Sequence, residues 1–226
     1  DGYMQLSDIS SNTLSNWHPY MHTLLIKMFY LLFGDVKYFI TFRIIIYACI
    51  LTNILFYFYK KNMSLTKIYI TAIFITILPV TGIFLVTMWK DVLFGTLMLL
   101  YTINIVELVH DTESYTSSWK RILGFIIITL LVMLLRNNGI YAIILSAPIV
   151  LIVFRKYYKQ IIIMFLIPII LYYCFNSFAY NVLKANKGNI AEALSVPMQQ
   201  MARVAKYHKD ELTEEQPISI LMNLFQ

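Results

Sequence analysis

The chain has 226 residues, of which 59% are hydrophobic, and a formal net charge of +6. This composition excludes an ordinary water-soluble domain and favours an all-α, polytopic membrane protein, because a bilayer span needs about 20 apolar residues. A positive charge can also indicate nucleic-acid binding. Here the basic residues lie in short loops without a polybasic arm, so we expect no nucleic-acid partner.

Residues 1–37 are predicted to form a first outer loop that ends in a short juxtamembrane helix. Positions 1–17 are polar and rich in Ser and Asn. Tyr20 to Phe33 is largely apolar but too short to cross a bilayer comfortably. Pro19 suits a first helical turn. We therefore expect this helix to lie along the outer membrane interface.

Residues 38–178 are predicted to hold six transmembrane helices, followed by an extracytoplasmic segment over residues 179–226. Pro79 should kink the second helix. Cys49 and Cys174 fall inside predicted helices, so we expect neither a disulfide nor a metal pair. The six predicted helices are Tyr38–Tyr59, Ile68–Met88, Val92–Val109, Ile122–Leu135, Ile140–Phe154 and Ile161–Phe178.

Basic residues alternate with Asp and Asn residues from one connection to the next. The basic connections are residues 60–67, 110–121 and 155–160, and such connections mark the cytoplasmic side. The intervening connections, 89–91 and 136–139, then face outward together with the two ends of the chain. The sequence therefore predicts a multi-pass plasma-membrane protein with a polar site on its extracytoplasmic face.

The connection Arg136-Asn137-Asn138-Gly139 is the strongest indication of a functional cavity. The predicted helices on either side have only about 14–17 apolar residues, so the turn should lie below the membrane surface. Polar side chains at that depth must face protein or water. Arg136 could otherwise reach toward the headgroups, but a guanidinium in a wet cavity suits a phosphate or pyrophosphate group.

Other polar residues admit two interpretations from the sequence alone. Lys90 and Asp91 could contact a phosphate and supply an acidic group, or they could be an interface anchor and a helix N-cap. Arg43 and Glu107 lie within predicted spans, near their ends, which favours side chains that reach to the interface. Asp1 could be a base, a metal ligand or a solvated loop residue.

His18 and His22 are four residues apart on the short helix. This spacing can hold a metal ion, but no matching carboxylate lies on the same helix, so the metal interpretation is weak. The simpler interpretation is that His18 caps the helix.

Five groups of residues follow one another along the predicted outer side. In their order and sidedness the chain resembles the GT-C superfamily of membrane glycosyltransferases, and looks closest to a bacterial branch of it. The resemblance also implies that a first span and most of a C-terminal outer domain are missing from this chain. The groups are Asp1 with Gln5, His18-Pro19, Trp89-Lys90-Asp91, Arg136-Asn137-Asn138-Gly139 and Pro197-Met198-Gln199-Gln200.

The resemblance implies transfer of a sugar from a polyprenyl-phosphate donor to a glycan, lipid or protein acceptor during cell-envelope assembly. Asp1 would be the catalytic carboxylate and Asp91 a second acidic residue, and either could hold a divalent metal ion. The expected substrate-binding residues are Lys90, Arg136, Asn137, Asn138, His18, Gln199 and Gln200.

Two other functions stay open at this stage. A transporter or flippase of a lipid-linked glycan would suit the prolines within the helices, although its site should lie near the midplane. A non-enzymatic protein of envelope assembly would explain the spans but not the gathering of polar residues at one end.

Overall fold

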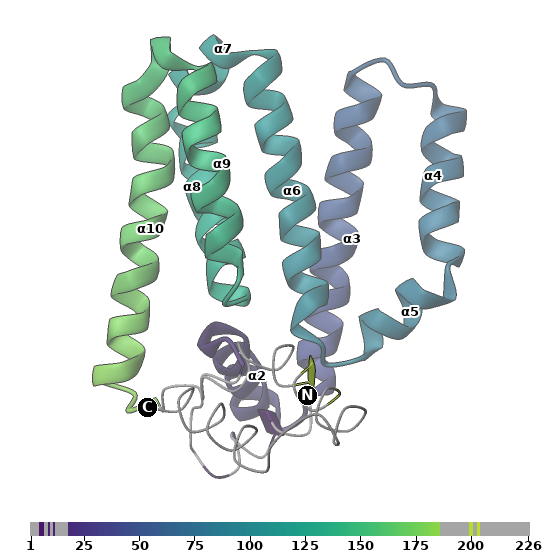
Figure 1. The fold of residues 1–226 in the computed structure, drawn as a ribbon. Coiled ribbons are helices and arrows are strands. Elements are labelled where there is room, and N and C mark those ends of the chain that lie inside the picture. The colour runs from purple at the N-terminus through teal and green to yellow at the C-terminus, as the bar shows by residue number, and fades with distance from the viewer. Residues whose placement is uncertain are drawn as a thin grey trace. The chain divides into compact units, whose positions relative to one another are not determined.

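The computed structural model describes residues 5, 6, 9, 11, 18–185, 199, 200 and 203. The chain divides into two compact units, Asp1–Asn186 and Lys187–Gln226. Within the first unit, residues 18–185 form a series of helices joined by short connections (Figure 1). The domain boundaries predicted at residues 37 and 178 stay a prediction. The helices are α2 (Tyr20–Phe33), α3 (Lys37–Lys60), α4 (Leu65–Ile77), α5 (Pro79–Val86), α6 (Lys90–His110), α7 (Thr112–Ser117), α8 (Trp119–Leu135), α9 (Gly139–Val153), the 3-10 turn η1 (Arg155–Tyr157) and α10 (Tyr158–Asn181).

Helix α8 is the centre of the packing, since α2, α6, α7, α9 and α10 all contact it. Phe125 of α8 packs against Tyr101 of α6 and Phe165 of α10, with ring centroids 5.4 and 5.3 Å apart. Helix α3 packs on α6, and α4 and α5 pack on α3 at the edge. Most outward-facing side chains are apolar, as a lipid-facing surface requires.

Three helices of the described chain are long and apolar enough to cross a membrane, or four if the bent pair α4–α5 is one span. The three are α3, α6 and the η1–α10 helix, Arg155–Asn181. Helices α8 and α9 have only 17 and 15 residues. The expected all-α fold with helices that could cross a membrane is thus confirmed for the described residues, while the number of six spans stays a prediction.

The expected kink at Pro79 is present. Helix α4 ends at Ile77, α5 begins at Pro79, and the two axes differ by 58°. Proline has no amide proton, and its ring obstructs the preceding helical turn, so a helix cannot pass through it undisturbed. Helix α5 therefore runs back from α4 toward the start of α6 (Figure 1).

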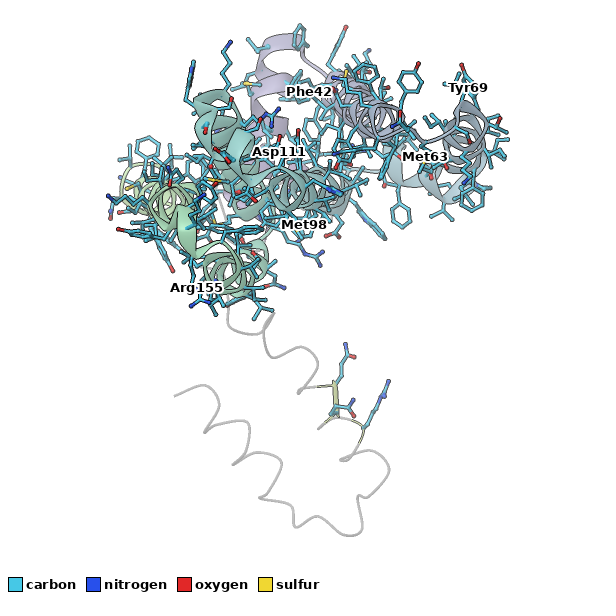
Figure 2. All side chains as sticks on the ribbon, turned by 90° about the horizontal axis from the view of Figure 1, so that it is seen from above. Phe42, Met63, Tyr69, Met98, Asp111 and Arg155 are labelled. Atoms are coloured by element: carbon cyan, nitrogen blue, oxygen red, sulfur yellow. The ribbon has the colours of Figure 1, made fainter. Side chains whose placement is uncertain are left out.

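The connections sort onto the two ends of the bundle as the charge pattern predicts. Residues 61–64, helix α7 and η1 lie at one end, and the α5–α6 and α8–α9 connections lie at the other (Figure 1). Figure 2 looks down from above, with Met63, Asp111 and Arg155 marking the three connections of the first end. Which compartment each end faces stays a prediction.

Helix α2 lies at the end with the α8–α9 turn rather than in the row of long helices (Figure 1). It packs on α3 and α8 and buries Tyr20 and Ile26. Gly34 ends it in the left-handed conformation, φ 75°, which glycine adopts at little cost. Leu31 and Leu32 are 71% and 67% exposed. This apolar surface is what the expected interfacial helix requires.

The predicted orientation can be tested by labelling single cysteines in a background that lacks Cys49 and Cys174. With an impermeant maleimide added to intact cells, a cysteine at Ser117 should stay unlabelled and one at Asn138 should react. This result is expected because basic connections mark the cytoplasmic side, which places Ser117 there in the predicted topology. Permeabilised cells, in which both positions should react, are the control. Labelling of Ser117→Cys from outside would reverse the orientation.

Candidate functional site

An ion pair joins the beginning of α6 to the end of α8. Arg136 Nη1 lies 2.9 Å from Asp91 Oδ1, and the two side chains are 40% and 45% exposed. Arg136 follows the last residue of α8, and Asp91 lies in the first turn of α6. The structure thus brings together two of the residues that the sequence assigned to one site. Their roles in that site stay predictions.

The α8–α9 turn fixes the place of Arg136. The Gly139 amide donates to the Arg136 carbonyl at 2.8 Å, and the guanidinium lies 5.2 Å from the centre of the Phe94 ring. A Cβ atom on Gly139 would lie 2.4 Å from the Val132 carbonyl oxygen, so the turn closes directly on α8. The turn also stops short of the ends of α3 and α10 (Figure 1). This recessed position matches the depth expected from the short helices.

Asp91 does not cap α6, so the N-cap interpretation was wrong. The helix begins at Lys90, and Trp89 occupies the cap position without a side-chain hydrogen bond. The Asp91 carboxylate points instead to Arg136. A carboxylate in the first turn still interacts favourably with the helix dipole.

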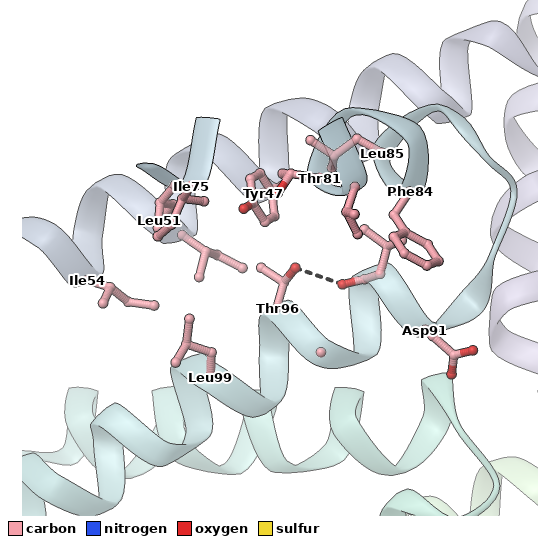
Figure 3. Close-up of a pocket in the computed structure, with 14 residues that line it drawn as sticks. Tyr47, Leu51, Ile54, Ile75, Thr81, Phe84, Leu85, Asp91, Thr96 and Leu99 are labelled. Atoms are coloured by element: carbon pink, nitrogen blue, oxygen red, sulfur yellow. Dashed lines mark hydrogen bonds between the residues drawn. The ribbon is translucent and has the colours of Figure 1, made fainter. Parts of the chain in front are cut away.

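Asp91 also lies at one end of a groove of about 350 Å³ between α3, α4, α5 and α6. Figure 3 shows its carboxylate turned away from the apolar side chains of the groove. The Thr96 hydroxyl, which lines the groove, is satisfied because it donates to the Val92 carbonyl at 2.7 Å. The groove is therefore mainly apolar, with Asp91 at one end. Its apolar lining includes Leu51, Ile54, Ile75, Phe84, Leu85 and Leu99.

Arg43 was expected to reach toward the interface, and this expectation is wrong. The side chain is completely buried. Its guanidinium donates to the carbonyls of Leu85 at 2.5 Å, Trp89 at 3.1 Å and Thr87. A charged residue within an apolar helix was a signal of function, but its carbonyl partners are more than 40 positions away in the sequence, so the pattern could not reveal them.

The burial of His22 and its hydrogen bond were also not predicted from the sequence. His22 is fully buried, and its Nδ1 lies 2.8 Å from Gln5 Nε2, which also donates to the Thr23 hydroxyl at 3.3 Å. Nδ1 is therefore an acceptor, which puts the ring proton on Nε2. Burial and then the charge of Arg43 lower the pKa of His22 to about 3, so the ring is neutral.

Acid should therefore destabilise this protein through His22. Its pKa is lowered from 6.5 to about 3 on folding, so between these pH values the unfolded chain binds more protons. The contribution to stability is complete above pH 6.5 and is lost as the pH falls toward 3, by at most about 1.4 kcal/mol per pH unit. Unfolding in detergent at several pH values measures this. His22→Asn should flatten the slope, whereas His110→Asn, at the far end of α6, should keep it.

The other predicted site residues have different surroundings. Lys90 is half-buried, and its charge contributes to the lowered pKa of His22. His18 is buried, so a ligand could reach it only after a local opening. The N-cap of α2 is Pro19 rather than His18.

Asn137 is half-buried and Asn138 exposed. Gln199 and Gln200 are exposed helical residues of the second unit. Asp1 lies outside the described residues.

Glu107 contacts Arg121 at 3.8 Å and is about one-third exposed, and its interfacial position stays a prediction. Within the described part of the chain, no three His, Cys, Asp or Glu side chains gather closely enough to hold a metal ion. Both cysteines are free in this structure.

Comparison with known proteins identifies a family but no activity. No curated protein and no solved structure matches the chain. One family model, described as a family of unknown function (DUF6020), matches residues 8–226, which is nearly the whole chain. The protein therefore belongs to the DUF6020 family.

Proposed function

We propose that this protein is a membrane glycosyltransferase that moves a sugar from a polyprenyl-phosphate donor to an acceptor at the outer face of the plasma membrane. The observation that carries the proposal is the meeting of Arg136 and Asp91 at the charged end of an apolar groove. A guanidinium suits a phosphate group, and a groove of this size suits an apolar chain beside it.

The resemblance to the GT-C superfamily supports the same function. The proposed topology has six spans, of which α8 and α9 are short because their connecting turn is recessed. The polar ends of α6 and α8 would then face the acceptor's side of the membrane. The acceptor would be a glycan, a lipid or a protein of the cell envelope.

In the proposed step, the acceptor hydroxyl oxygen bonds to the anomeric carbon of the sugar. The bond between that carbon and the phosphate oxygen breaks, and its electron pair leaves with the polyprenyl phosphate. Asp1 takes the hydroxyl proton as general base. Arg136 and Lys90 stabilise the negative charge that grows on the departing phosphate.

A divalent metal ion could assist this step only if carboxylates were available to it. Asp1 and Asp91 are the candidate ligands, and Asp91 is held by Arg136 in this structure. A metal ion at Asp91 would therefore compete with Arg136 for the carboxylate, and the guanidinium would be free to turn to the phosphate.

A flippase for a lipid-linked glycan is the second candidate, because one observation favours it. The α4–α5 pair is bent by 58° at Pro79, and transporters use interrupted helices of this kind. The start of α6 and the α8–α9 connection, which carry Asp91 and Arg136, however, lie toward one end of the bundle rather than at its middle (Figure 1). This placement favours transfer at a surface over passage through the membrane.

The test uses the full-length protein in vesicles that contain a labelled polyprenyl-phosphate sugar and an envelope lipid and glycan fraction. We expect label to move to the acceptor, and Asp1→Asn to abolish transfer while leaving donor binding intact. Asp35→Asn, which removes an exposed carboxylate paired with Lys37, is the matched control. Movement of intact donor between leaflets without transfer would establish the flippase instead. If the protein neither transfers the sugar nor moves the donor, both proposed functions are refuted.

A further inference from the structure

We infer that Arg43 is a positioning residue whose guanidinium holds the α5–α6 connection and thereby sets the place of Lys90 and Asp91. The hold of the Arg43 guanidinium on the α5–α6 connection is called the clamp below. The significance of that place for donor binding rests on the proposed function, but the clamp itself does not. No sequence pattern connects Arg43 with Asp91, since the two lie on different helices, α3 and α6.

Two of the three carbonyls that Arg43 binds, those of Leu85 and Thr87, have no partner within a helix. The Trp89 carbonyl stands at the N-cap position of α6, where it also accepts the first bond of that helix. Helix α5 ends at Val86, so the Leu85 carbonyl belongs to its last turn, where intrahelical partners are lacking. Thr87 and Trp89 are extended, with ψ of 148° and 130°. A cation at the carboxyl end of a helix is also favoured by the helix dipole. Arg43 therefore caps α5 from the neighbouring helix α3.

Full burial makes this arrangement demanding. Among the described residues, the ion pairs include no carboxylate partner for Arg43, so main-chain carbonyls carry the compensation for its charge. The Phe39 ring adds a cation–π contact, 5.9 Å from the guanidinium carbon. A buried cation that lost these partners would be strongly destabilising. The connection is consequently held in one place.

Two parts of the candidate site follow from that place. Asp91 comes two residues after Trp89, whose carbonyl Arg43 binds, and pairs with Arg136. Leu85, whose carbonyl Arg43 also binds, lines the groove. One buried side chain thus determines both the apolar wall of the groove and its charged end.

Lysine cannot replace this arginine, although it keeps the charge. The guanidinium uses Nη1 for Trp89 and Nη2 for Leu85 and Thr87. Lysine has one nitrogen on a flexible stem and lacks this planar fork. We expect Arg43→Lys to insert and fold but to leave the α5–α6 connection in more than one position.

The first arm of the test observes the connection without any activity. Trp89 is the reporter, after Trp17→Phe and Trp119→Phe remove the other tryptophans; its ring lies 5.0 Å from that of Phe84. In vesicles of phosphatidylcholine and phosphatidylglycerol, Arg43→Lys should change the quenching of Trp89 by brominated lipid and lower its anisotropy. Arg121→Lys, a matched substitution at the other end of the bundle, should change neither.

The second arm measures the affinity for polyprenyl phosphate, with decyl phosphate and inorganic phosphate as comparisons. Arg43→Lys should weaken binding about tenfold, and Arg121→Lys should not. If Arg43→Lys fails to accumulate, Phe39→Leu keeps the guanidinium but removes its ring contact, and should give smaller changes in the same direction.

Unchanged quenching and anisotropy of Trp89 in a folded Arg43→Lys variant would overturn the clamp. If these two signals change but the affinity for polyprenyl phosphate does not, the control of the site by Arg43 is overturned. Wild-type protein that binds no polyprenyl phosphate would refute the proposed function, and the Trp89 arm would still decide the clamp.

Discussion

Arg136→Ala should weaken the binding of a polyprenyl-phosphate donor about ten- to hundredfold while hardly changing the stability of the fold. A charge-assisted hydrogen bond to a partly desolvated phosphate contributes about 1.5–3 kcal/mol, and each 1.4 kcal/mol corresponds to about a factor of ten in affinity. The ion pair with Asp91 is 40–45% exposed, and pairs of this kind contribute at most about 1 kcal/mol to stability.

Further variants of Arg136 and Asp91 separate the effects of charge and of guanidinium geometry on donor binding. Arg136→Lys keeps the charge but loses the planar fork, so it should bind the donor with intermediate affinity. Asp91→Asn removes a carboxylate that repels phosphate and competes for Arg136, so its donor affinity should equal or exceed that of the wild type. Donor titrations in nanodiscs measure these affinities, with Arg121→Ala as the control at the opposite end. Unchanged affinity in Arg136→Ala would return Arg136 to an anchoring role.

Gly139→Ala should destabilise the protein by about 1–3 kcal/mol, the usual range for overpacking a close contact. The added Cβ would lie 2.4 Å from the Val132 carbonyl oxygen and 3.2 Å from the Met133 Cα atom. Both are main-chain atoms of α8, which cannot turn aside as a flexible side chain would. The α8–α9 turn must therefore move, and Arg136 moves with it.

Gly124→Ala is the matched control on α8. Nothing lies within 4 Å of a Cβ atom at Gly124, so alanine should be neutral there or stabilise the helix by up to about 1 kcal/mol. Thermal unfolding in detergent compares the two variants with the wild type. Donor affinity should fall in Gly139→Ala alone. Equal melting temperatures for both variants would show that the turn is not closed as tightly as the structure indicates.

Features that depend on neighbouring residues were predicted from the sequence. The bend at Pro79 follows from the missing amide proton of one residue, and the recessed turn at Arg136 follows from the lengths of the adjacent helices. The sorting of the connections onto two ends follows because successive long helices run along the bundle in alternating directions. The short helix from Tyr20 to Phe33 likewise needed only local pattern, whereas Gln5, Leu6 and Ile9 are helical where a loop was predicted.

Only the tertiary structure decided which polar groups meet. Arg43 lies in an apolar helix whose local pattern favours an interfacial side chain, yet its partners are carbonyls more than 40 residues further along. Carbonyls occur at every position, so no residue type marks the ones that will need a cap. Asp91 looked equally suited to capping α6 and to binding a ligand, and its pairing with Arg136 depends on how α6 packs against α8. Such packing depends on side-chain shape across the whole bundle, which hydrophobic periodicity does not record.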